Sequence, residues 1–168
     1  LDAMAATTVT VLSDYNKGVL SAPVCAALIE GAQKLGRKII VDPKGRDYAR
    51  YKGADILTPN RKELAEATNM PVESEAQIVT AAKALIAWYG FGAVLVTRSE
   101  DGMSLITADE VHHFPGEARE VYDVSGAGDT VVAALAACIA AEVPLVEAAR
   151  LANICLLYTS PSPRDRTR

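Results

Sequence analysis

Short runs of β-branched and apolar residues alternate with helix-like segments along this chain, and this alternation constrains the fold more than any other feature. Residues 8–13 and Lys38–Asp42 are predicted strands, and the apolar residues between them recur at helical spacing, with Pro23 in the first turn. A strand–helix–strand unit of this kind forms a parallel sheet covered by helices. The sequence therefore predicts an α/β fold, a doubly wound sheet with helices on both faces.

The segments that follow extend this pattern and add an antiparallel edge. Asn60 and Ser74 each open a predicted helix, and each is followed three residues later by Glu or Gln, which is the spacing of a capping box. Further strands are expected at 54–57 and Ala93–Thr97, and shorter antiparallel strands at Met103–Thr107, Val111–Phe114 and 120–124. A last helix is expected from Pro144 to about Ile154.

The two ends of the chain differ from the rest. The chain begins at Leu1 and enters a predicted strand almost at once, and residues 155–168 switch abruptly from an apolar helix pattern to Ser, Pro and Arg. This tail resembles the read-through of a sequencing adapter, so we expect it to be non-native and leave it out of the predicted fold. We expect the chain to be a fragment of a longer protein.

The composition excludes several classes of function. Half of the residues (50%) are hydrophobic, which is enough to build the core of a single domain. The net charge of −4 and the acidic pI of about 5.2 predict neither a nucleic-acid partner nor a membrane-surface partner. No apolar run approaches the ~20 residues that span a bilayer, and no signal peptide opens the chain.

The cysteines and histidines do not predict a metal site. Cys25, Cys138 and Cys155 lie far apart, and no Cys or His spacing suits zinc. His112 and His113 are neighbours in a predicted strand, so their side chains point to opposite faces and cannot share one metal. We therefore expect a protein of the reducing cytoplasm.

A glycine-rich segment carries the strongest chemical signal in the chain. Residues 123–130 read Asp-Val-Ser-Gly-Ala-Gly-Asp-Thr and lead directly into an apolar helix pattern at 131–141. Glycines ahead of a helix let free N–H groups and the positive end of the helix dipole face an anion. Asp129 would repel a resting phosphate, but it can accept the proton of a hydroxyl that attacks a phosphoryl group. The alternative is that Asp129 only caps the helix.

Other polar residues are predicted at the same edge of the sheet. Asp14, Lys44, Asn60 and Arg98 each follow a predicted strand, and functional loops gather at the carboxyl ends of such strands. We expect these residues to share one cleft with the glycine-rich loop. The common nucleotide motifs do not account for the set, because the Walker A Gly-Lys pair, the protein-kinase triplets and the third glycine of a dinucleotide fingerprint are all missing.

Residues 123–130 resemble the signature of the ribokinase-like carbohydrate kinases. The stretch Thr58-Pro-Asn-Arg-Lys-Glu63 resembles the Asn-x-x-Glu motif of that family. Thr97-Arg-Ser-Glu-Asp-Gly102 resembles its nucleotide loop, with Ser99 in place of a glycine. The resemblance implies a ribokinase-like fold, ATP as the phosphoryl donor and Mg²⁺ as a cofactor. It also implies that residues 1–154 are about the C-terminal half of such a kinase domain.

The resemblance further implies roles for individual residues. Asp129 would be the catalytic base, and the backbone amides of Gly126, Ala127 and Gly128 would form the anion hole. The nucleotide would be bound by Asn60, Glu63, Thr97, Arg98 and Gly102. Glu63 would help to hold Mg²⁺ through water, because Mg²⁺ favours oxygen ligands and keeps several waters, and Asn60 would contribute less.

Within the family, three segments are most similar to the D-glycero-D-manno-heptose 7-phosphate kinases: Ser13-Asp-Tyr-Asn-Lys-Gly18, Asp42-Pro-Lys-Gly45 and Leu57-Thr-Pro-Asn60. This similarity implies ATP-dependent phosphorylation of the sugar at O1, giving the 1,7-bisphosphate in lipopolysaccharide precursor synthesis. Asp14, Lys17 and Lys44 are then candidate substrate contacts. The alternatives are another sugar kinase of the family (ribokinase, fructokinase or 1-phosphofructokinase) and an inactive nucleotide-binding fragment.

Several of these residues also have plainer interpretations. Taken alone, Asn60 and Glu63 predict a capping box, and Lys17 and Lys44 predict ordinary surface lysines. Arg98 could simply pair with Glu100 or Asp101. Tyr15 and Tyr122 could simply be packing residues. The sequence leaves the oligomeric state open, with a homodimer as one option.

Overall fold

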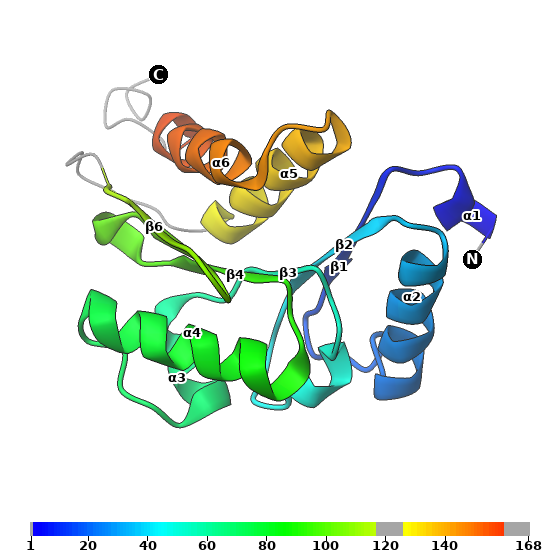
Figure 1. Cartoon of the computed structure of the whole chain (residues 1–168), viewed down its shortest axis with the longest axis horizontal. Helices are drawn as coiled ribbons and strands as arrows, with labels where there is room; N and C mark the ends of the chain where they lie inside the picture. Colours follow the sequence, from blue (N-terminus) through cyan, green and yellow to red (C-terminus); the bar gives the residue numbers. More distant parts are fainter. Residues whose placement is uncertain (1, 117–125, 160–168) are drawn as a thin grey trace, which may run out of the picture.

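The centre of the molecule is a six-stranded sheet (Figure 1), seen in a computed structural model that describes residues 2–116 and 126–159. The strands lie in chain order, from β1 at one edge to β6 at the other. The first four run parallel to one another, and β5 pairs antiparallel with both of its neighbours, β4 and β6. Their bounds are β1 (Val9–Ser13), β2 (Lys38–Asp42), β3 (Ile56–Leu57), β4 (Ala93–Thr97), β5 (Met103–Thr107) and β6 (Val111–Phe114).

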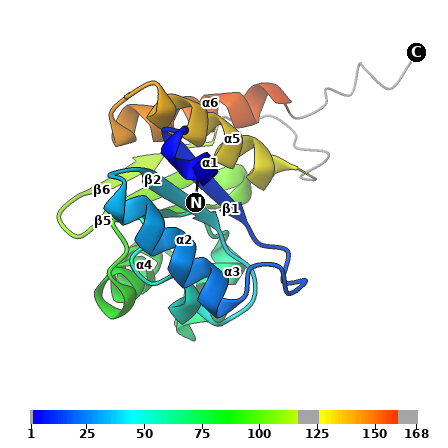
Figure 2. The same cartoon turned by 90° about the vertical axis from the view of Figure 1, so that its right-hand side faces the viewer.

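Helices cover both faces of this sheet. One face carries α2, α3, α4 and η1, and the opposite face carries α5 and α6, so Figures 1 and 2 show the sheet between two helical layers. Their bounds are α1 (Asp2–Ala5), α2 (Ala22–Lys34), the 3₁₀ turn η1 (Tyr48–Tyr51), α3 (Arg61–Thr68), α4 (Glu75–Tyr89), the 3₁₀ turn η2 (Ser99–Asp101), α5 (Ala127–Ala140) and α6 (Leu145–Thr159). The predicted α/β fold with an antiparallel edge and helices on both faces is confirmed.

The hydrophobic core has two parts, one on each face of the sheet. Along β4 the side chains alternate, so Val94 and Val96 join the core under α4, and Ala93 and Leu95 join the core under α5 and α6. All four are buried, because a parallel sheet of this kind is covered on both faces. The near-continuous apolar runs in the sequence reflect this double burial.

Three boundaries differ from the sequence-based expectations. The helix predicted to end near Ile154 continues to Thr159, because no helix breaker occurs before the Ser-Pro pair at 160–161. The strand predicted at 54–57 shortens to β3, and the helix predicted from 131 begins at Ala127. The strand predicted at 120–124 lies outside the described residues.

The sheet places the loops of interest at a single edge. Because β1 to β4 are parallel, the loops that follow them all leave from their carboxyl ends. In residues 2–116 and 126–159, no helix has the length and apolar character needed to cross a membrane. The carboxyl edge of the sheet thus holds the residues that the sequence singles out.

Candidate active site

Asp129 lies in the first turn of α5, just behind a left-handed glycine. Gly126 is the N-cap residue, with φ of 81°, a conformation that glycine adopts without a steric penalty. A Cβ atom built on Gly126 or Gly128 would meet no atom of the described residues within 4 Å. The carboxylate of Asp129 is exposed and accepts a hydrogen bond from the Tyr15 hydroxyl, at 3.4 Å to Oδ1 and 3.5 Å to Oδ2. Asp129 thus faces the loop that follows β1.

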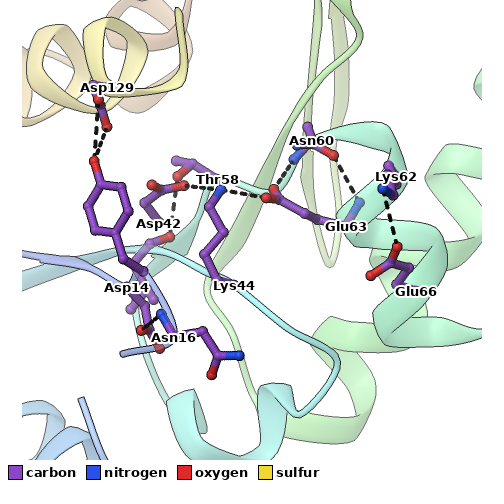
Figure 3. Close-up of polar contacts among 12 residues, drawn as sticks. Asp14, Asn16, Asp42, Lys44, Thr58, Asn60, Lys62, Glu63, Glu66 and Asp129 are labelled. Carbon is purple, nitrogen blue, oxygen red and sulfur yellow. Dashed lines mark hydrogen bonds and ion pairs between the residues drawn. The ribbon is translucent and has the colours of Figure 1, made fainter. Parts of the chain in front are cut away.

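Lys44 links two carboxylates across from Asp129. Its Nζ atom lies 2.5 Å from Oε1 of Glu63 and 4.0 Å from Oδ1 of Asp42 (Figure 3). Partial burial alone would lower the pKa of Lys44, but the hydrogen bond to Glu63 and the charge of Asp42 raise it above its ordinary value. Lys44 is therefore a charged, half-buried side chain with fixed partners, unlike an ordinary surface lysine.

The raised pKa of Asp42 reflects its burial and the other carboxylates at this edge. Burial is the largest cause that raises the pKa of Asp42, which reaches about 6. The charges of Glu63, Asp129 and Asp14 raise it further, and Lys44 acts in the opposite direction. We call these four carboxylates, Asp14, Asp42, Glu63 and Asp129, the acidic cluster. A cationic group or a divalent ion would relieve their mutual repulsion.

Asn60 and Glu63 form the capping box at the start of α3, as predicted. Oδ1 of Asn60 accepts from the Glu63 N–H, and Oε2 of Glu63 accepts from the Asn60 N–H, both at 2.9 Å. The other oxygen of Glu63 accepts a hydrogen bond from Lys44, so the capping bond orients this carboxylate toward Lys44. Asn60 also bridges to β4 at Thr97, which ties the start of α3 to the nucleotide loop predicted from the sequence.

These residues fit an Mg²⁺ ion held through water. Mg²⁺ takes oxygen ligands, keeps several of its waters and is commonly held by one or two carboxylates. Glu63 and Asp42 supply such oxygens on either side of Lys44. Within residues 2–116 and 126–159, no three His, Cys, Asp or Glu side chains converge closely enough for a fully protein-bound metal. The arrangement therefore suits a hydrated ion and not a closed structural site.

Asp14 lies directly after β1, as expected, and its carboxylate is hydrogen-bonded to the protein. Its side chain is 3% exposed, and it accepts hydrogen bonds from the Tyr51 hydroxyl at 2.5 Å and the Asn16 N–H at 2.7 Å. Arg50 adds an ion pair at 3.3 Å. These bonds make Asp14 an anchor of the β1 loop, and its contact with a substrate stays a prediction. Lys17, on the same loop, is exposed.

Arg98 departs from its predicted partners. It is 4% exposed and pairs with Glu75 at 2.6 Å, whereas Asp101 pairs with Arg61 at 2.5 Å. Neither Glu100 nor Asp101 holds Arg98, because its side chain turns toward the start of α4. Together with His113 these groups line a pocket of about 300 Å³, which we call the arginine pocket. Its cations already have carboxylate partners.

A comparison with protein-family models identifies the family of this chain. The model of the pfkB family of carbohydrate kinases matches residues 1–155. The chain belongs to the pfkB carbohydrate kinase family. Among relatives in this family, the bifunctional protein HldE of Acidiphilium cryptum is 63% identical over 153 residues, and that of Paramagnetospirillum magneticum is 60% identical over 147 residues. These matches cover 91% and 87% of this chain, but only 32% and 30% of the relatives.

Two solved kinase structures share the fold. Arabidopsis thaliana ribokinase, in complex with ribose and ATP, is 25% identical, with a TM-score of 0.82 over 96% of this chain and 52% of that protein. Escherichia coli phosphofructokinase-2 in complex with fructose-6-phosphate is 22% identical, with a TM-score of 0.76 over 90% of this chain and 50% of that protein. The chain thus spans about a third of the relatives it matches and about half of these kinases. The predicted ribokinase-like fold is confirmed.

The predicted nucleotide loop of this pfkB chain has a backbone that favours glycine at two positions. Gly102 has φ of 88°, and a Cβ there would lie 2.1 Å from the carbonyl oxygen of Phe114, so the position requires glycine for close packing. Ser99 has φ of 55°, in the left-handed region, where the family resemblance leads us to expect a glycine. The departure at Ser99 therefore keeps the backbone conformation of the loop.

Tyr15 is the residue that the sequence interpretation missed. The expected packing of Tyr15 with Tyr122 lies outside the described residues. Tyr15 is 59% exposed, and its hydroxyl contacts Asp129. Its position directly after Asp14, at the carboxyl end of a parallel strand, was the available signal. The structure thus brings Lys44, Asn60 and Glu63 to one edge with Asp129, adds Tyr15 and Asp42, and turns Arg98 toward α4.

Proposed function

We propose that this chain is the phosphate-handling half of an ATP-dependent D-glycero-D-manno-heptose 7-phosphate kinase, which phosphorylates the sugar at O1 to give the 1,7-bisphosphate. The observation that carries the proposal is the exposed Asp129 in the first turn of α5, facing the Lys44–Glu63 pair across an open edge. A carboxylate beside free helix N–H groups suits proton abstraction next to a developing phosphoryl charge.

In this proposal the chain supplies positioning and charge, which phosphoryl transfer mainly requires. Asp129 takes the proton of the O1 hydroxyl as that oxygen attacks the γ-phosphorus of ATP, and ADP leaves. The N–H groups of Gly126, Ala127 and Gly128 face the oxygens of the transferring group. When Mg²⁺ is bound, Glu63 and Asn60 hold its water shell, and the ion neutralises phosphate charge.

Cations near Asp129 complete the proposed site. Lys44 stands between Asp42 and Glu63, from which its ammonium group can reach a phosphate oxygen of ATP or of the sugar. Lys17, exposed on the β1 loop, is a second candidate for the 7-phosphate. On the nucleotide side, we propose that Thr97 and Gly102 contact ATP through their backbone and that Arg98 holds the loop in place through Glu75.

The heptose specificity rests on relatives and on sequence similarity. Several of the bacterial relatives, all named bifunctional protein HldE, are 60–63% identical over the matched segment, and the structural likeness to phosphofructokinase-2 shows the fold alone. The proposal places the reaction in lipopolysaccharide precursor synthesis, in the cytoplasm where ATP is supplied. Another pfkB sugar substrate is the principal alternative.

A second candidate function follows from the length of the match. The chain covers 52% of the Arabidopsis ribokinase, so the part that would complete the sugar site lies in the other half of such a fold. As an isolated polypeptide, the chain would then bind ATP and Mg²⁺ without transferring a phosphoryl group. Calorimetry with ATP and Mg²⁺ on the 168-residue chain tests this binding directly.

The kinase itself is tested in a hybrid enzyme. In the hybrid enzyme, residues 1–155 of this chain replace the matching segment of the Acidiphilium cryptum HldE protein, which is 63% identical. We expect ATP-dependent turnover with D-glycero-D-manno-heptose 7-phosphate, and much slower turnover with ribose, fructose or fructose 1-phosphate. Preference for one of those sugars would overturn the heptose assignment, and the absence of transfer to any of them would overturn the kinase proposal.

A further inference from the structure

The β1 loop holds a tyrosine that the proposed chemistry has not used. Tyr15 is 59% exposed, and its hydroxyl lies 3.4 Å and 3.5 Å from the two carboxylate oxygens of Asp129. The two residues are far apart in the chain, on the β1 loop and on α5. Among the described residues no aromatic ring pair includes Tyr15, and the described contact of its side chain is the one to Asp129.

The residue before Tyr15 is fixed more firmly than any other part of this loop. Asp14 is buried and accepts from the Tyr51 hydroxyl at 2.5 Å, from the Asn16 N–H at 2.7 Å and from Arg50 at 3.3 Å. Its own N–H donates to the carbonyl of Asp42 at 3.0 Å. The loop is therefore anchored at its first residue, and the phenol of Tyr15 projects from a rigid base.

The surroundings of Asp129 explain why a neutral donor suits this position. Asp129 acts electrostatically on the nearby Asp42 carboxylate, and the ammonium group of Lys44 is already bonded to Glu63. An arginine or lysine bonded to Asp129 would hold it, but would also stabilise its charge strongly. A phenol hydroxyl orients a carboxylate with one hydrogen bond and leaves most of its lone pairs free to accept a proton.

We propose that Tyr15 is a positioning residue that holds the Asp129 carboxylate toward the sugar hydroxyl, an inference that rests on the proposed kinase function. The hydroxyl of Tyr15 donates to Asp129 throughout and does not itself exchange a proton with the substrate. Distances of 3.4–3.5 Å are long for an O–H···O bond, as is common in sites without substrate, where such bonds tighten in the reactive complex.

The activity test is Tyr15→Phe in the hybrid enzyme. We expect kcat to fall about 3- to 10-fold, which is the effect of one lost hydrogen bond, with KM for both substrates and the melting temperature unchanged. Tyr89→Phe, which removes a hydroxyl at the far end of α4, is the matched control and should change nothing. In an Asp129→Asn background, Tyr15→Phe should cost no further activity, because Tyr15 acts only through Asp129.

Other outcomes would separate Tyr15 from its alternatives. A kcat within twofold of the unmodified hybrid enzyme would overturn the proposal, and so would a rise in the sugar KM alone, which indicates a substrate contact. A lower melting temperature with unchanged kcat would indicate a structural role only. If the hybrid enzyme transfers no phosphoryl group, the kinase proposal itself is overturned, and the proposed role of Tyr15 is overturned with it.

A spectroscopic test needs no catalysis. In the 168-residue chain labelled with 3-fluorotyrosine, the ¹⁹F resonance that Tyr15→Phe removes belongs to Tyr15. We expect this resonance to move in Asp129→Asn and to stay in place in Glu66→Gln, a change on α3 at the ion pair with Lys62. If the ¹⁹F shift of Tyr15 is the same in Asp129→Asn, the contact is overturned, independently of the activity of the hybrid enzyme.

Discussion

Two groups of charged residues lie near the carboxyl edge of the same sheet, and they differ in how far their charges are paired. In the acidic cluster, carboxylates outnumber cations, and the pKa of Asp42 rises to about 6 through burial and its neighbours' charges. In the arginine pocket, Arg98 pairs with Glu75 and Arg61 pairs with Asp101. Within the acidic cluster, Asp129 is exposed and has no described ion pair, so its charge is available to a ligand, whereas the paired charge of the arginine pocket mainly holds the protein together. The comparison therefore favours the acidic cluster as the reactive site.

The largest effect should come from Asp129→Asn. We expect turnover of the hybrid enzyme to fall by about 10²–10⁴, because the side chain can no longer accept the proton. ATP binding should remain or tighten slightly, since a carboxylate that repels phosphate is gone, and thermal stability should not change because Asp129 is exposed. Normal turnover in this variant would contradict the role of base. Steady-state kinetics and calorimetry on the same preparations measure both.

Asp42→Asn should change the way stability depends on pH. The folded protein holds the proton of Asp42 up to a pKa of about 6, whereas the ordinary value is 3.8, so ionisation of Asp42 lowers stability as the pH rises between these values. The asparagine variant escapes this loss and should gain up to about 3 kcal/mol on the parent chain between about pH 4 and pH 7. Urea unfolding of the chain at several pH values measures the difference. A difference independent of pH would show that Asp42 does not resist ionisation.

Glu75→Gln should destabilise the arginine pocket. Arg98 is 4% exposed and loses its carboxylate partner, so we expect the free energy of unfolding to fall by about 1–2 kcal/mol. Glu73 lines the same pocket and has no described ion pair, so Glu73→Gln serves as the control. We expect it to change the free energy of unfolding by less than about 0.5 kcal/mol. Equal effects of the two variants would mean that the pairing of Arg98 is not what stabilises this pocket.

The smallest effect should come from the nucleotide loop. Ser99 has φ of 55°, which a residue with a Cβ adopts at a cost, so Ser99→Gly should stabilise the chain by about 0.5–1 kcal/mol. Ser99→Ala keeps the Cβ and should leave stability unchanged, which separates the backbone from the hydroxyl. Thermal melts of the three proteins measure this. A destabilised glycine variant would show that the serine side chain holds the loop.

The fold was more predictable than the site. Strand Lys38–Asp42 and the helix caps at Asn60 and Ser74 follow from local rules of composition and spacing, and the structure reproduces them. The end of α6 was misjudged because a change in composition after Ile154 was taken as the end of a helix. A helix continues through such a change until proline or glycine interrupts it.

The site was predictable only where position along the chain decides it. The parallel strands bring Lys44 and Asn60 to one edge, so the proximity of these two residues follows from topology. The partner of a long side chain does not follow from topology. Arg98 reaches Glu75 on α4 and Tyr15 reaches Asp129 on α5, and both contacts depend on tertiary packing that no sequence spacing encodes.

The central claim is that phosphate binds at the start of α5 and the Lys44–Glu63 pair, and not in the arginine pocket. Titration of the ¹⁵N-labelled 168-residue chain with ATP and Mg²⁺, followed by NMR, tests this most directly. We predict that the amides of Gly126, Gly128 and Asp129 and the resonances around Lys44 shift first and furthest. Shifts gathered instead at Arg98 and His113, or no shifts at any ATP concentration, would contradict the account.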